Sequence, residues 1–237
     1  MKMFLTAEWK YIVMLNYEIQ PEILHSLVPS GTEIDTWNGK TFLSIVGFLF
    51  LKTKVRGIPI PFHRNFEEVN LRFYVRRTVE GETRRGVVFV KEFVPRFAIA
   101  ATARLLYNEK YFSLPMDHAV DPGKGIFEYR WKSGKEWQSL QAKTSGGPQL
   151  LISGSQEEFI SEHYWGYTAQ KDGTTIEYRV EHPRWRVWQV NQSVLKCSVS
   201  AVYGPEYENA FRNPVSSAFV AEGSSVAVHK GINIGKG

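Results

Sequence analysis

Cysteine is almost absent from this sequence, since Cys197 is the single one among 237 residues. One cysteine cannot form an intramolecular disulfide, and this composition is typical of a reducing cytoplasm. Long hydrophobic runs are absent too, because the longest, residues 42–51, is far shorter than the roughly 20 residues that span a bilayer. The N-terminus has no apolar signal-peptide core before its first charges. We therefore expect a soluble cytoplasmic protein that does not associate with a membrane.

The motifs of the common catalytic and cofactor-binding sites are also missing. There is no nucleophile elbow, P-loop, dinucleotide fingerprint or HExxH run. The six histidines show no ligand spacing, so we expect no metal and no cofactor. The formal net charge of +5 would suit a nucleic-acid partner, but the basic residues are scattered in pairs with acids nearby. The sequence thus favours a small anionic molecule over a nucleic acid as the partner.

The residues that are abundant predict a β-rich fold with a substantial core. Hydrophobic residues make up 43% of the chain and aromatic residues 14%, which is enough to build that core. The Asn38-Gly39 pair between two β-prone runs predicts a tight type I′ turn, since this turn needs positive φ at both positions. Apolar runs bounded by turn residues predict further strands at residues 41–51, 86–93, 126–131, 137–143, 166–170, 175–181 and 187–203.

Helices are predicted to be few and short. One begins at the proline of residue 21, an alanine-rich segment predicts a second over residues 97–107, and a capping box at Ser155 opens a third. The sum is an α+β fold, mainly antiparallel β, in a single domain over residues 1–237. Glycine, serine, asparagine and proline increase toward the end of the chain, so we expect much of residues 205–237 to be an irregular tail.

The stretch over residues 66–76 gives the clearest functional signal. As a strand it alternates between two faces, because successive side chains point to opposite sides. One face is apolar, and the other presents Glu68, Asn70, Arg72, Tyr74 and Arg76. We interpret the polar face as a ligand site in a cleft or lumen; the alternatives are a solvated strand face and an internal Glu–Arg salt bridge. Glu68 and Arg72 would lie about 13 Å apart along the strand, too far to pair directly.

Two other charge patterns are weaker signals. Glu67 and Glu68 are adjacent in the predicted strand, so their carboxylates point to opposite faces and cannot form a catalytic pair. Arg184 and Arg186 would share a face of an extended segment, with the spacing of a carboxylate or phosphate clamp. No partner for the two guanidiniums is evident from the sequence, and we favour the interpretation that both are solvated.

Several runs of the sequence together resemble the YqjF-like family of uncharacterised bacterial proteins, which belongs to the acetoacetate decarboxylase-like fold group. The most specific is the Glu-x-Asn-x-Arg-x-Tyr-Val pattern that begins at Glu68. The others are Leu5-Thr6-Ala7-Glu8-Trp9, Pro21-Glu22-Ile23-Leu24, Ala103-Arg104, Glu162-His163-Tyr164 and His182-Pro183-Arg184-Trp185. The resemblance implies a cone- or barrel-like curved sheet around an internal pocket, with two or three short helices outside. It also adds Arg104 to the predicted ligand site.

The resemblance does not carry the decarboxylase chemistry with it. Those enzymes form a Schiff base through a desolvated lysine of depressed pKa, in a Gly-Arg-Glu-x-x-Gly-x-Pro-Lys-Lys run. When Arg104 is aligned with the arginine of that run, Tyr111 and Phe112 fall on the two lysines. Lys110 falls on the proline. We therefore predict Tyr111 at the position of the nucleophile, unless the register slips by one residue and brings Lys110 there.

These observations leave three hypotheses for the function, and they leave open whether the protein is an enzyme. In the first, the protein binds a small anionic organic molecule without a Schiff-base lysine. In the second, it is a lyase or decarboxylase that acts on a keto acid through Lys110. In the third, it is a structural or oligomer-forming domain whose polar strand face is solvated or lies at an interface. A homo-oligomer is compatible with the first two as well.

Overall fold

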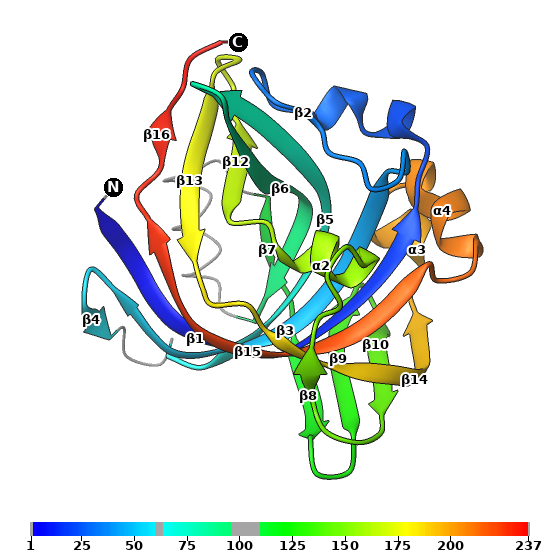
Figure 1. The fold of residues 1–237 in the computed structure, drawn as a ribbon. Coiled ribbons are helices and arrows are strands. Elements are labelled where there is room, and N and C mark those ends of the chain that lie inside the picture. Colours follow the sequence, from blue (N-terminus) through cyan, green and yellow to red (C-terminus); the bar gives the residue numbers. More distant parts are fainter. Residues whose placement is uncertain (1, 60–63, 96–109, 237) are drawn as a thin grey trace.

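The long strands form one curved sheet that closes into a ring (Figure 1). This computed structural model describes residues 2–59, 64–95 and 110–236. In order around the ring lie β13 (Thr175–Glu181), β12 (Trp165–Ala169), β6 (Glu82–Val94), β5 (Phe66–Val79), β3 (Phe42–Val55), β1 (Met3–Glu18) and β15 (Ser217–His229). The ring closes because β15 pairs with both β1 and β13. Its pairs are antiparallel except for β12 with β6, so the predicted mainly antiparallel fold is confirmed.

A second group of strands extends the sheet beyond β15. It consists of β14 (Arg186–Lys196), β10 (Glu136–Thr144), β9 (Ile126–Ser133) and β8 (Met116–Asp121). The short strands at the margins are β2 (Glu33–Ile34), β4 (Ile58–Pro59), β7 (Tyr111–Ser113), β11 (Gln149–Leu150) and β16 (Ile232–Asn233). The strands predicted over residues 126–131 and 137–143 correspond to β9 and β10.

The helices of the described residues are short, as the sequence predicts. They are the 3₁₀ helices η1 (Pro21–Ile23), η2 (His25–Leu27) and η3 (Pro205–Tyr207), and the α-helices α2 (Gln156–Ser161), α3 (Val199–Val202) and α4 (Glu208–Arg212). The capping box predicted at Ser155 is present, because its side chain accepts a hydrogen bond from the backbone N–H of Glu158. Within the described ranges, none of these helices combines the length and the apolar character that a membrane span requires. The helix predicted over residues 97–107, with Arg104, lies outside the described residues.

The ring sheet is packed on both of its faces. On one, here called the β9 face, Leu71 and Phe73 of β5 belong to a cluster with β9, β10, α3 and α4. On the other, the α2 face, Met14 of β1 and Tyr74 of β5 cluster with Phe159 of α2. On the polar face of residues 66–76, Glu68, Asn70 and Tyr74 are therefore buried, whereas Arg72 is half-buried and Arg76 is partly exposed.

β3 is an interior strand of the ring sheet, which suits a sequence that is apolar on both faces. Residues 42–50 are all buried, and the strand runs between β1 and β5. Gly47 allows the β9–β10 hairpin to approach, since a Cβ there would lie 2.7 Å from Cδ2 of Tyr129. The strand predicted over residues 41–51 is thus confirmed, and it extends to Val55.

The predicted Asn38-Gly39 turn is present. Trp37 and Lys40 exchange backbone hydrogen bonds of 3.1 and 3.0 Å, and Asn38 and Gly39 have φ angles of 50° and 74°. Both angles are positive, as a type I′ turn requires. The turn does not join two long paired strands, however, because β2 pairs with β5 rather than with β3.

The structure corrects the predicted end of the chain. The irregular tail predicted over residues 205–237 instead contains η3, α4 and the long strand β15. Serines and Gly223 lower the β propensity of this segment, but pairing with β1 at the opposite end of the chain overrides it. The strand predicted over residues 187–203 is also too long, since β14 ends at Lys196 and α3 follows.

Candidate functional site

Two of the predicted site residues, Glu68 and Asn70, are buried side by side on the α2 face of β5. They are 2% and 1% exposed. Asn70 Nδ2 donates a 2.9 Å hydrogen bond to Glu68 Oε1, and the hydroxyl of Tyr111 donates a 3.1 Å bond to Glu68 Oε2. Tyr111 reaches Glu68 because β7, which it begins, pairs in parallel with β6. The structure thus brings together Glu68 and Tyr111, which the sequence analysis treated separately.

Arg72 lies on the same face of β5, and it has no acidic partner among the described residues. Its Nη2 lies 3.7 Å from Met14 Sδ, and its Cζ lies 5.7 Å from the centre of the Tyr74 ring. Its Nε is buried and has no hydrogen-bond partner in the described part of the chain. Since Glu68 bonds to Asn70 and Tyr111, the internal Glu68–Arg72 salt bridge is not formed, as the spacing predicts.

The ring of Tyr74 packs beside Arg72, whereas its hydroxyl takes part in a separate chain of buried hydrogen bonds. Ser44 Oγ lies 2.6 Å from the Tyr74 hydroxyl and donates a 2.6 Å bond to Asn16 Oδ1. Because the Ser44 proton is committed to Asn16, the Tyr74 hydroxyl is the donor to Ser44. Asn16 continues the chain by donating a 2.9 Å bond to Ser217 Oγ. This buried polar chain crosses β5, β3, β1 and β15 and fixes the orientation of the Tyr74 ring.

A buried aspartate–histidine pair lies beside Tyr74. His163 Nε2 lies 3.2 Å from Asp35 Oδ2, and Arg85 Nε donates a 2.7 Å bond to the same oxygen. The His163 ring packs 4.6 Å from the Tyr74 ring. Sequence reasoning missed this cluster, because Asp35, Arg85 and His163 are far apart in the chain. The one signal was the family-like Glu162-His163-Tyr164 run.

Burial determines the charge states of this pair. Burial lowers the pKa of His163 to about 4 even though the hydrogen bond to Asp35 opposes the shift, and the charge of Arg85 lowers this pKa further. Burial alone would raise the pKa of Asp35, but the hydrogen bonds from His163 and Arg85 outweigh it and lower that pKa. At neutral pH His163 is therefore uncharged and Asp35 is ionised. Nε2–H of His163 donates to Asp35, and Nδ1 has no partner among the described residues.

A cavity of about 980 Å³ lies at the edge of the α2 face. Ala7 and Val226, which line it, belong to the α2-face cluster. His182 lines it as well, and burial, to which the charge of Arg72 adds, lowers the pKa of His182 to about 4. The other polar residues that line the cavity are Thr6, Glu8, Lys52, Lys54, Arg64, Tyr164, Arg179, Glu181 and Ser225. The predicted site residues of β5 do not line this cavity.

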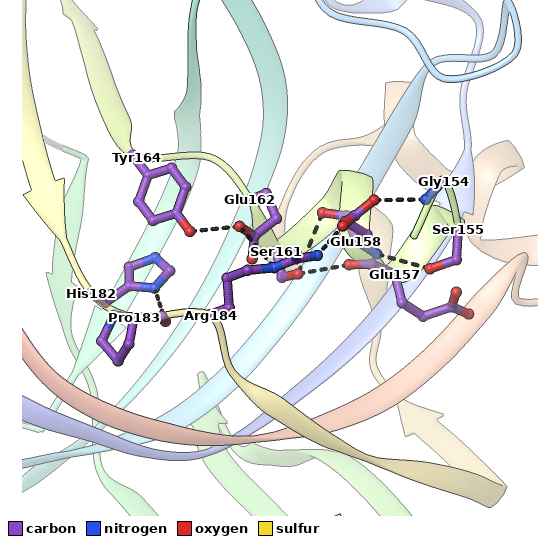
Figure 2. A network of polar contacts seen from close by, with 10 residues as sticks. All are labelled: Gly154, Ser155, Glu157, Glu158, Ser161, Glu162, Tyr164, His182, Pro183 and Arg184. Carbon is purple, nitrogen blue, oxygen red and sulfur yellow. Dashed lines mark hydrogen bonds and ion pairs between the residues drawn. The ribbon is translucent and has the colours of Figure 1, made fainter. Parts of the chain in front are cut away.

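Arg184 and Arg186, which have the spacing of an anion clamp and which the sequence analysis interprets as solvated, both contact other parts of the protein. Figure 2 shows Arg184 directed at Glu158 and Glu162 of the α2 segment, with ion pairs to both. Tyr164 donates a 2.6 Å hydrogen bond to Glu162 in the same network. Arg186 donates to the backbone carbonyl of Pro148. Both arginines are exposed. The ion pairs of Arg184 connect the α2 segment to the chain that leads into β14, so the described contacts of the two arginines are structural ones.

Lys110, the alternative Schiff-base candidate, lies directly before β7. The residue is exposed, and its backbone carbonyl accepts a 3.0 Å hydrogen bond from Glu92 N–H. Arg104, the other cation predicted for the site, lies outside the described residues. The described side chains contain no group of three or more histidine, cysteine, aspartate or glutamate residues that could hold a metal ion.

Comparisons with known proteins agree with the fold and with the sequence pattern. The model of the DUF2071 family, described as an uncharacterized conserved protein, matches residues 6–225. The uncharacterized protein YqjF of Bacillus subtilis is 26% identical over 196 residues, which cover 82% of this chain and 78% of that protein. The family match spans the whole of β5.

Solved structures of similar fold include acetoacetate decarboxylase from Legionella pneumophila, with a TM-score of 0.72 at 11% identity over 98% of this chain and 88% of that chain. The enduracididine biosynthesis enzyme MppR, complexed with pyruvate, has a TM-score of 0.69 at 10% identity over 100% and 92%. An acetoacetate decarboxylase-like enzyme from Sphingomonas wittichii has a TM-score of 0.64 at 11% identity over 100% and 95%. Because the identities are this low, the likeness extends to the fold alone.

Proposed function

Because this chain belongs to the DUF2071 family and has an acetoacetate decarboxylase-like fold, we propose that it binds a small anionic organic molecule on the α2 face of the ring sheet. Arg72 is the residue that receives the negative charge of this molecule. Glu68, Asn70, Tyr74 and Tyr111 surround it and set the shape of the site. The complex of the similarly folded MppR with pyruvate is consistent with a carboxylate as the anion.

The observation that carries this proposal is the guanidinium of Arg72, which has no acidic partner among the described residues and whose Nε has no hydrogen-bond partner there. Arg72 is half-buried, and its Nε is shielded from solvent. A shielded cationic group without a counter-ion is costly, and proteins pair such groups or use them to bind ligands. The described residues offer Arg72 a thioether and an aromatic ring but no carboxylate. Its field also acts on His163 and His182, both of which are uncharged at neutral pH. A ligand carboxylate would supply the missing negative charge and a partner for Nε.

Substitution of Arg72 by methionine tests this role against a structural one. Because no acid in the described part of the chain would lose its partner, we expect Arg72→Met to melt within a few degrees of the wild type. Carboxylic acids such as pyruvate should raise the melting temperature of the wild type and not that of the variant. Arg76→Met is the matched control, because Arg76 is on the same strand but pairs with the exposed Glu33. A large loss of stability in Arg72→Met, without any ligand effect on the wild type, would refute the proposal.

The alternative of a lyase acting through Lys110 predicts a different chemical outcome. A Schiff base between a lysine and a keto acid is trapped by borohydride as a stable adduct that mass spectrometry detects. We expect no adduct at Lys110, since the residue is exposed whereas a Schiff-base lysine is desolvated. An adduct on Lys110 would support the hypothesis that the protein is a lyase acting through this lysine. If there is neither ligand binding nor an adduct, the structural or oligomer-forming reading is the one that stands.

A further inference from the structure

The hydrogen-bonding character of the site around Arg72 limits which anions fit it. Two buried acceptor atoms on this face, Asn70 Oδ1 and His163 Nδ1, receive no hydrogen bond from any described residue. Both residues are buried, with Asn70 at 1% and His163 at 7% exposed. Burying an acceptor without a donor costs about 1–3 kcal/mol of free energy, so a ligand that supplies a donor to one of these atoms binds more tightly.

The orientation of the Asn70 amide follows from its neighbour. Its Nδ2 lies 2.9 Å from a carboxylate oxygen of Glu68, and only the NH₂ end of the amide can donate to a carboxylate. The Oδ1 end is therefore the one without a partner. Glu92, which is 1% exposed, stands directly opposite Asn70 in β6, and residues opposite each other in a ladder share a face. The surroundings of Asn70 are thus rich in acceptors.

His163 presents a second acceptor on the other side of Arg72. Its Nε2–H is directed at Asp35, which leaves the lone pair of Nδ1 to accept. Its ring packs on Tyr74, two residues beyond Arg72 on β5, whereas Asn70 lies two residues before it. Residues two apart on one face of a strand are about 7 Å apart, so a small ligand held by Arg72 would lie between Asn70 and the Tyr74 ring on which His163 packs.

We propose, on the basis of the function proposed above, that the ligand is a carboxylic acid with a hydrogen-bond donor near its carboxylate, such as a hydroxyl or amino group, rather than a keto acid. The carboxylate pairs with Arg72, and the donor bonds to Asn70 Oδ1 or His163 Nδ1. A keto oxygen only accepts hydrogen bonds, so it would face these acceptors without a partner. A hydroxyl would satisfy the neutral acceptors, and an ammonium group would in addition be attracted by Glu92.

The test compares three acids with the same three-carbon skeleton: pyruvate, lactate and alanine. Calorimetric titration of the wild-type protein should show lactate or alanine binding at least about tenfold tighter than pyruvate, the factor expected when one buried acceptor gains or lacks its donor. The four-carbon set of acetoacetate, 3-hydroxybutyrate and 3-aminobutyrate repeats the comparison with the donor one carbon further away. Tighter binding of the amino acid assigns the donor to an ammonium group, and tighter binding of the hydroxy acid assigns it to a hydroxyl.

Substitution of the acceptor tests the residue directly. If Asn70 Oδ1 accepts the hydrogen bond from the ligand, Asn70→Leu should bind the donor-bearing acid and the keto acid with affinities within about threefold of each other. If His163 Nδ1 accepts it, His163→Phe should do so instead. Asn191→Leu, at an exposed asparagine, is the matched control and should leave the preference unchanged. The wild-type comparison needs no variant to fold, so the inference can be refuted even if Asn70→Leu does not.

The outcomes separate this inference from the function on which it rests. If the wild type binds pyruvate as tightly as lactate and alanine, or more tightly, and Arg72→Met abolishes binding, the preference for a donor is wrong while the proposed function stands. The same holds for acetoacetate in the four-carbon set. If no acid of either set binds the wild type, the proposed function fails and this inference fails with it.

Discussion

Replacing His163 by phenylalanine should change how the stability of this protein depends on pH. Burial lowers the pKa of His163 to about 4 in the folded state, whereas a histidine in an unfolded chain titrates near about 6.5. Between these values the unfolded state binds a proton that the folded state does not. The stability contributed by the uncharged imidazole is therefore fully present above the unfolded pKa and is lost as the pH falls toward the folded pKa.

The size of this effect follows from the two pKa values. Between about pH 7.5 and about pH 5 the linkage amounts to about 2 kcal/mol in the free energy of unfolding. Phenylalanine preserves the ring contacts with Tyr74 and Phe159 but has no titrating group. His163→Phe should therefore lose about 2 kcal/mol less than the wild type over this pH interval, even though the loss of the Asp35 hydrogen bond lowers its stability at every pH.

The assay is urea denaturation followed by tryptophan fluorescence at both pH values, for the wild type, His163→Phe and His163→Gln. Glutamine keeps an amide donor for Asp35 and, like phenylalanine, does not titrate. Both variants should show the shallower pH dependence, and His163→Gln should be the more stable of the two at pH 7.5. If the wild type and both variants lose the same free energy between the two pH values, His163 is not the uncharged buried group that this reasoning requires.

Two further substitutions test the packing of the ring sheet. Glu177 is fully buried and accepts hydrogen bonds from Arg77 and Arg84 at 3.0 and 2.7 Å, so Glu177→Leu should lower the free energy of unfolding by about 3–5 kcal/mol, measured by urea denaturation. Gly47→Ala would place a Cβ 2.7 Å from Tyr129 Cδ2, and we expect it to cost about 1–3 kcal/mol in the same measurement.

Each of these substitutions has a control. Glu82→Gln removes an exposed carboxylate that lies 3.9 Å from Arg84, and it should change stability by less than about 1 kcal/mol. Gly147→Ala adds a Cβ with no neighbouring atom within 4 Å at an ordinary φ, so it should be close to neutral. Equal effects of Glu177→Leu and Glu82→Gln, or of the two glycine substitutions, would show that the buried contacts do not have the energetic role assigned to them.

Local sequence signals predict the parts of this fold that local physics determines. The alternation along residues 66–76 predicts the two faces of β5, because the period of a strand is two residues. Asn38-Gly39 predicts its turn because few other residue pairs adopt two positive φ angles. β15 was missed because its serines and Gly223 give a weak local signal, and its partner β1 is at the other end of the chain.

The candidate site is predicted in part for the same reason. The face of β5 that carries Glu68, Asn70 and Arg72 follows from the strand period alone. The partners of these residues do not, since Tyr111 reaches Glu68 through the pairing of β7 with β6. The pairing of His163 with Asp35 depends on the placement of α2 over the sheet. Contacts of this kind arise from the tertiary fold, so no local sequence pattern predicts them.

The measurement that tests the central claim most directly is calorimetric titration of the wild type, Arg72→Met and Arg76→Met with pyruvate, lactate and alanine. The account predicts that the wild type and Arg76→Met bind at least one of these acids with equal affinity. Arg72→Met should bind it about 10- to 100-fold more weakly, as expected for the loss of a charge-assisted hydrogen bond. Binding of the acid by Arg72→Met with wild-type affinity would contradict the claim that Arg72 receives the anion.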